Sequence, residues 1–137
     1  METRSRLELS KYRFERALKT LETSKQIIAM DTNASANRSY YAIFYALLAV
    51  TSLDGFEASK HSSVISYFNR NYVKTKIFSG KASDLIRTSF RIRTNADYGE
   101  FYTVSTASAQ IQINSAETII SMIRPYLEER WAEMEAK

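Results

Sequence analysis

The chain has 137 residues and a formal net charge of +4 at pH 7, with three glycines, one proline and no cysteine. The absence of cysteine excludes a disulfide framework, a thiolate nucleophile and a cysteine-ligated zinc site. So few glycine and proline residues exclude a β protein with many turns, and no apolar run approaches the ~18 residues of a membrane span. The charged N-terminus is unlike a signal peptide, so we expect a cytoplasmic, all-α protein.

The first two predicted helices carry strong apolar patterns. Ser5 and Glu8 have the spacing of a capping box, and the apolar residues that follow recur at helical steps as far as Ile28. The second helix, predicted over residues 34–53, contains the run YYAIFYALLAV, which is apolar nearly all round. A helix of this kind is usually buried, and we therefore expect it to be the central helix of the fold.

The remaining elements are predicted to be shorter, apart from the last. Ser59 is placed to cap a third helix, and a fourth helix ends near Phe90. Residues 91–102 are expected to be irregular, and a long fifth helix begins near Val104. Pro125 should kink that helix before a frayed acidic tail. The sequence thus predicts one domain over residues 1–137, with its core over about 5–127, as an up-and-down bundle of about five helices.

The positive charge is concentrated in one part of the chain. Residues 69–93 contain seven basic side chains and one acid, whereas the rest of the chain has twelve basic and fourteen acidic residues. Such a cluster favours binding of the phosphates of RNA or of a nucleotide. The alternative is an ordinary solvated face.

Four short segments are more specific than composition. In chain order they are NRSYYAIFYA (37–46), a Lys–His pair (60–61), YF and YVK (67–68 and 72–74) and RTNADY (93–98). Their order and separation resemble the HEPN domain family, over nearly the whole chain. The match is closest to small stand-alone prokaryotic members, which are often encoded beside a minimal nucleotidyltransferase.

The resemblance implies an α-helical bundle that forms a homodimer. Members of this family act as toxins of toxin–antitoxin pairs, as RNases in defence systems, or as non-catalytic RNA- or nucleotide-binding modules. Catalytic members use an Arg and a His that are separated by four to six residues, and these meet across the dimer as a composite RNase site. In some toxins, a Tyr two places beyond that His is modified by the nucleotidyltransferase.

This chain departs from the catalytic pattern because Asp97 stands where the His is expected after Arg93 or Arg91. Metal-free RNA cleavage requires a group that exchanges a proton near neutral pH, which imidazole does and an ordinary carboxylate does poorly. His61 is the single histidine of the chain, and contact with Arg93 across a dimer is its route to catalysis. The catalytic candidates are therefore Arg93, Asp97, Tyr98 and Arg91.

Arg93 and Asp97 would form an ion pair if the segment between them is helical, which gives both a structural alternative to catalysis. Asp97 is also a candidate partner for Arg38, whose guanidinium lies on an otherwise apolar helix. The candidates for binding nucleotide or RNA are Arg38, Arg87, Lys81 and His61. No motif requires a metal or an organic cofactor.

These observations lead to three hypotheses. The first is a homodimer with a nucleotidyltransferase partner, which binds nucleotide or RNA and cleaves RNA weakly or not at all. The second is an active metal-independent RNase. The third is a protein-interaction module with no nucleic-acid ligand.

Overall fold

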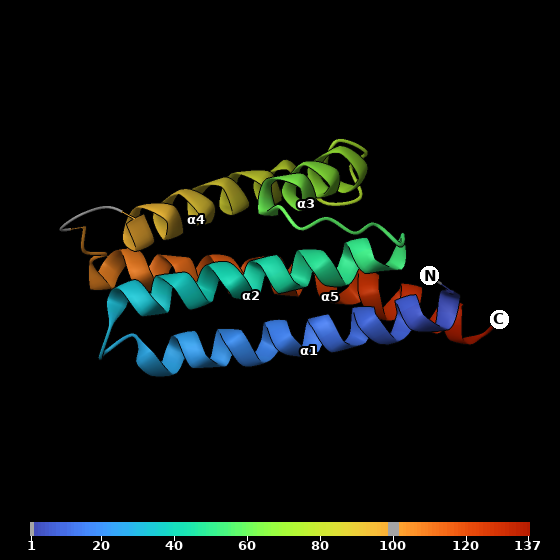
Figure 1. The fold of residues 1–137 in the computed structure, drawn as a ribbon, viewed down its shortest axis with the longest axis horizontal. Coiled ribbons are helices and arrows are strands. Elements are labelled where there is room, and N and C mark those ends of the chain that lie inside the picture. The colour runs from blue at the N-terminus through green and yellow to red at the C-terminus, as the bar shows by residue number, and fades with distance from the viewer. Residues whose placement is uncertain (1, 99–101) are drawn as a thin grey trace.

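The computed structural model describes residues 2–98 and 102–137, and within these ranges it is all-helical with no strand (Figure 1). This confirms the predicted all-α fold of about five helices. In chain order the elements are α1 (Thr3–Ile27), α2 (Thr32–Leu53), α3 (His61–Phe68), the π-helical turn η1 (Asn69–Val73), α4 (Gly80–Tyr98) and α5 (Thr106–Glu135). The first and last helices bring the two termini to the same end of the bundle.

Helix α2 is the centre of the fold, as its apolar run predicts. It lies between α1 on one side and α3 and α4 on the other, and α5 packs along it (Figure 1). Ile43, Leu47 and Val50 are fully buried and share one core with Ile119 and Ile123 of α5. Burying side chains of this size stabilises the fold by about 1.5–3 kcal/mol each.

The seam between α1 and α2 is made of small side chains. On α1, Ser10, Ala17 and Ser24 recur at steps of seven and are fully buried. Ser10 Oγ donates to the carbonyl of Ala49 over 2.6 Å, and Ser24 Oγ lies 2.6 Å from Ser39 Oγ. Because no long side chain separates the two helices here, their backbones lie close together.

The N- and C-terminal helices are joined near the chain ends. Trp131 of α5 donates from its indole nitrogen to Ser10 Oγ over 2.8 Å, and its ring packs edge-on against Phe14. Lys11 pairs with Glu135 at 2.8 Å. Helix α5 contains Pro125 and continues to Glu135, where the sequence had suggested a frayed tail. No helix among the described residues is long and apolar enough to cross a membrane.

Two predicted helix caps are wrong. Helix α1 begins at Thr3, which places Ser5 inside it, and α3 begins at His61 with Lys60 rather than Ser59 at the N-cap. Helix α2 is capped at both ends. The Asp31 side chain accepts from the amide of Ala34 at its start. At its end, a Schellman motif uses Gly55, whose φ of 74° lies in the left-handed region.

The prediction that residues 91–102 are irregular is also wrong for most of that range, because α4 continues to Tyr98. Asparagine, aspartate and glycine close together are typical of a turn, but here two contacts favour the helix. Arg93 and Asp97 pair one turn apart, and Asp97 accepts from Asn37 of α2. Further along, the amide of Val104 donates to Asn33 Oδ1 over 2.7 Å, which holds the start of the next segment on α2.

Candidate functional site

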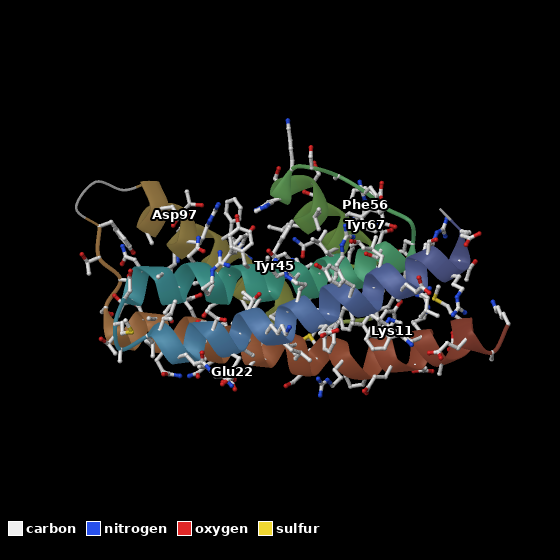
Figure 2. The ribbon with its side chains drawn as sticks, turned by 60° about the horizontal axis from the view of Figure 1, so that its bottom comes forward. Lys11, Glu22, Tyr45, Phe56, Tyr67 and Asp97 are labelled. Atoms are coloured by element: carbon white, nitrogen blue, oxygen red, sulfur yellow. The ribbon has the colours of Figure 1, made fainter. Side chains whose placement is uncertain are left out.

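The centre of the candidate site is the ion pair between Arg93 and Asp97. Arg93 Nε lies 2.9 Å from Asp97 Oδ2, and the two side chains are 14% and 29% exposed. The same carboxylate oxygen accepts from Asn37 Nδ2 over 3.0 Å. Asp97 lies near the C-terminal end of α4 (Figure 2). Because one oxygen both pairs with Arg93 and accepts from Asn37, Asp97 ties α4 to α2.

The Arg93 guanidinium lies against two aromatic rings of α2. Its carbon is 5.4 Å from the ring centres of both Tyr40 and Tyr41, which is within the range of a cation–π contact. Its Nη2 also donates to the Tyr41 hydroxyl over 3.1 Å. Tyr40 is 1% exposed, and burial raises the pKa of its hydroxyl, although the positive charge of Arg93 opposes this. The guanidinium is therefore held in place by carboxylate, hydroxyl and ring together.

Arg38 joins this arrangement through the side chain of Asn37, which lies between it and Asp97. Its Nε and Nη2 donate to Asn37 Oδ1 over 3.1 and 2.7 Å. Its guanidinium carbon lies 5.1 Å from the Tyr41 ring centre. The amide of Asn37 therefore accepts from Arg38 and donates to Asp97. Two arginines, one from α2 and one from α4, thus contact the same tyrosine.

His61, at the start of α3, meets the same group of residues. Its Nδ1 lies 2.8 Å from the Tyr40 hydroxyl, and its ring centre lies 4.0 Å from that of Phe44. Burial lowers the pKa of His61, and the positive charge of Arg93 lowers it further. The sequence had suggested contact between His61 and Arg93 across a dimer. That contact stays a prediction; within one chain, both residues lie against Tyr40 and Tyr41.

The other predicted site residues also lie on α4. Arg91 and Lys81 are exposed, and Arg87 pairs with Asp84 at 2.7 Å. Tyr98 is the last residue of α4, and its side chain lies outside the described part of the structure. Among the described residues, no group of three or more His, Cys, Asp or Glu side chains is placed to hold a metal ion.

We call the assembled residues the Arg93 centre and define it as Asn37, Arg38, Tyr40, Tyr41, His61, Arg93 and Asp97. Sequence reasoning did not assign roles here to Asn37, Tyr40 or Tyr41. The signal was present in their spacing, since residues 37, 40, 41 and 44 lie three to four apart and share one face of a helix. Because residues 91–102 were predicted to be irregular, the part of α4 that contacts this face was not expected.

One family model and two relatives match this sequence. The family model for the HEPN domain matches residues 10–128. A UPF0332 protein from Thermotoga maritima is 32% identical over 115 residues, which cover 83% of this chain and 87% of that protein. A protein from Methanocaldococcus jannaschii named "Putative toxin MJ0142" is 26% identical over 128 residues, which cover 93% and 86% of the two chains. The chain therefore belongs to the HEPN domain family.

Proposed function

We propose that this protein is the HEPN component of a toxin–antitoxin-like module and that it binds RNA or a nucleotide with little or no cleavage. In this proposal it works as a homodimer beside a nucleotidyltransferase partner. The observation that carries the proposal is the Arg93 centre, where the two motif segments of the sequence converge on one guanidinium. Family membership and the name of the archaeal relative support the toxin-like role.

The chemistry of Asp97 supports weak cleavage. Removal of a proton from a ribose 2′-hydroxyl, followed by its return to the leaving oxygen, needs a group that both accepts and donates near neutral pH. Asp97 occupies the position of the histidine in catalytic relatives, and its Oδ2 is already paired with Arg93 and accepts a hydrogen bond from Asn37. A carboxylate so engaged suits the positioning of Arg93 rather than proton transfer.

The binding role is tested with a fluorescently labelled single-stranded RNA oligomer in EDTA, with anisotropy and gel electrophoresis on the same samples. We expect binding that weakens as salt rises, because phosphate contacts release counterions, and RNA that stays intact. Sedimentation of the same protein should give a dimer. Absence of binding at low salt would overturn the proposal. Copurification with the nucleotidyltransferase encoded beside it, where there is one, tests the partner.

A second candidate function is metal-independent RNA cleavage, and the placement of His61 favours it. The imidazole lies in the same centre as Arg93, and its lowered pKa favours the neutral form that can act as a base. Cleavage in EDTA that is lost in both His61→Gln and Arg93→Gln, but kept in Lys19→Gln, which removes an exposed charge from α1, would establish this function in place of the first.

A further inference from the structure

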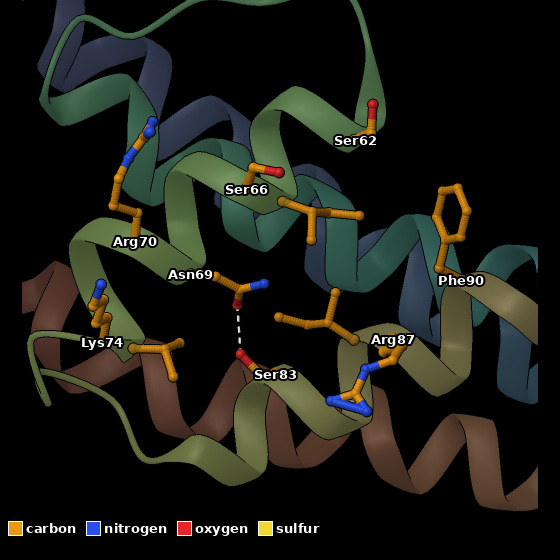
Figure 3. A pocket seen from close by; sticks show the side chains of 11 residues that line it. Ser62, Ser66, Asn69, Arg70, Lys74, Ser83, Arg87 and Phe90 are labelled. Carbon is orange, nitrogen blue, oxygen red and sulfur yellow. Dashed lines mark hydrogen bonds between the residues drawn. The ribbon is translucent and has the colours of Figure 1, made fainter.

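A groove lies between α3 with η1 on one side and α4 on the other (Figure 3). Its volume is about 750 Å³. Arg70 and Lys74 stand at one end and Phe90 at the other, with Arg87 on the α4 wall. We call this space the α3–α4 groove. It shares no residue with the Arg93 centre, although the two adjoin.

The walls of the groove combine three kinds of side chain. Cationic groups come from Arg70, Lys74 and Arg87, and none of the eleven described side chains that line the groove is acidic. Arg70 and Lys74 form no ion pair with an acid of the described chain, whereas Arg87 pairs with Asp84. The other lining residues are apolar or small and polar: Ile65, Val73, Ile86, Phe90, Ser62, Ser66, Asn69 and Ser83.

The π-helical turn η1 shapes one end of the groove. The amide of Lys74 donates to the carbonyl of Asn69 five residues earlier, over 2.8 Å, which is the π-helical pattern. Asn69 Oδ1 also accepts from Ser83 Oγ of α4 over 2.6 Å, so the two walls are joined (Figure 3). Asn69, Arg70 and Val73 all line the groove as a result of this wide turn.

The groove reaches the Arg93 centre at its other end. Phe90 lines the groove, and its ring lies edge-on to Tyr40 with centres 5.6 Å apart. Ser62 lines the groove as well and directly follows His61. A ligand that fills the groove from Arg70 to Phe90 therefore arrives beside the tyrosine that contacts both His61 and Arg93.

We propose that the α3–α4 groove binds a segment of single-stranded RNA whose phosphates contact Arg70, Lys74 and Arg87. This inference rests on the proposed function, and it specifies the ligand and the part of the protein surface along which the ligand lies. Cations that follow a backbone, with apolar and aromatic surface for unpaired bases, are the features of single-strand binding. The hydroxyl groups of Ser62, Ser66 and Ser83 and the side-chain amide of Asn69 add partners for the ribose 2′-hydroxyl.

The first test removes two cations at the groove end. Arg70→Ala/Lys74→Ala is compared with Arg4→Ala/Lys19→Ala, which removes two exposed charges from α1 on the far side of the bundle (Figure 1). For a labelled single-stranded RNA, we expect the slope of log affinity against log salt to fall by about 1.4 in the groove variant, since each phosphate contact contributes about 0.7. The control should keep the wild-type slope, and its affinity should be slightly lower by the same amount at every salt concentration. Circular dichroism verifies that both fold.

The second test concerns the aromatic end and the kind of ligand. Phe90→Leu keeps apolar contact with Tyr40 and removes the face on which a base can stack, so we expect about tenfold weaker binding. Single-stranded DNA and duplex RNA of the same length should bind less tightly than single-stranded RNA. If Arg70→Ala/Lys74→Ala bound RNA with the affinity and the salt slope of the wild type, the assignment of the binding site to the groove would be wrong, and the proposed function would stand. Equal affinity for DNA would overturn the RNA assignment, and no binding at all would overturn the proposed function itself.

Discussion

The hydroxyl of Tyr40 and Nδ1 of His61 lie 2.8 Å apart, so a core residue fixes the orientation of the chain's single histidine. Tyr40 is 1% exposed and its ring also meets Phe44 and Phe90. Because so buried a tyrosine has no room to turn away, His61 keeps its place at the start of α3. The properties of this imidazole therefore report on the Arg93 centre as a whole.

We predict that His61 titrates below the usual histidine value of 6.5 and that Arg93→Gln raises its pKa. Burial is the larger cause of the lowering and remains in the variant, whereas the repulsion by the Arg93 charge is removed. The measurement is an NMR titration of the imidazole protons, which belong to this residue alone. Arg91→Gln, which removes an exposed charge on the same helix, is the matched control and should leave the pKa unchanged.

The same shift predicts how stability depends on pH. Since the folded pKa of His61 lies below the unfolded value, the unfolded chain binds more protons between the two. The free energy of unfolding should therefore fall as the pH falls from about 6.5. His61→Asn cannot titrate in this range and should have a flatter profile in urea unfolding. A variant profile that is as steep as the wild type would show that other groups cause the dependence.

A further prediction concerns two tyrosines that share one carboxylate. Tyr72 and Tyr67 donate to Asp54 Oδ2 over 2.6 and 3.0 Å, but Tyr72 is 3% exposed whereas Tyr67 stacks with Phe56 nearer the surface (Figure 2). Tyr72→Phe should lower the free energy of unfolding by about 1.5 kcal/mol, and Tyr67→Phe by about 0.5 kcal/mol. Equal losses in chemical denaturation would contradict the difference in burial as the cause.

The seam between α1 and α2 should tolerate no larger residue. Ala17→Leu places three further carbon atoms at a fully buried position between Ser10 and Ser24. We expect a loss of about 2–3 kcal/mol from overpacking. Ala132→Leu makes the same change at an exposed helical position on α5 and should shift the free energy of unfolding by less than about 0.5 kcal/mol. Similar effects at both sites would mean that helix propensity, not packing, is decisive.

The helices could be predicted from the sequence because the apolar residues on the buried face of a helix recur at helical spacing. The apolar run of α2 and the stripe of α5 belong to helices that bury one or more faces. The Arg93–Asp97 pair was predictable on the condition that the segment is helical, because residues four apart then face each other. That condition depends on Asn37, sixty positions earlier in the chain. No local pattern reports a contact of this length.

The groove had no signal of its own in the sequence. Its cations were visible as a charge cluster, but a cluster does not reveal which members share a cavity. Arg70 and Arg87 do, while Lys81 lies outside the lining. The wide turn of η1 was equally hidden, because its residues carry no special pattern and its hydrogen bonds depend on how α3 meets α4.

Helix α2 presents two contrasting sides, and this contrast affects how variants of the protein behave. Toward α1 it offers small, buried side chains such as Ser39 and Ala49, and larger residues at these positions are expected to disturb the packing. Toward α3 and α4 it offers Tyr41 and Asn37, which are partly exposed and contact the charged groups. If the proposed function holds, we expect substitutions of Tyr41 or Asn37 to change binding more than stability, and substitutions on the side toward α1 to do the reverse.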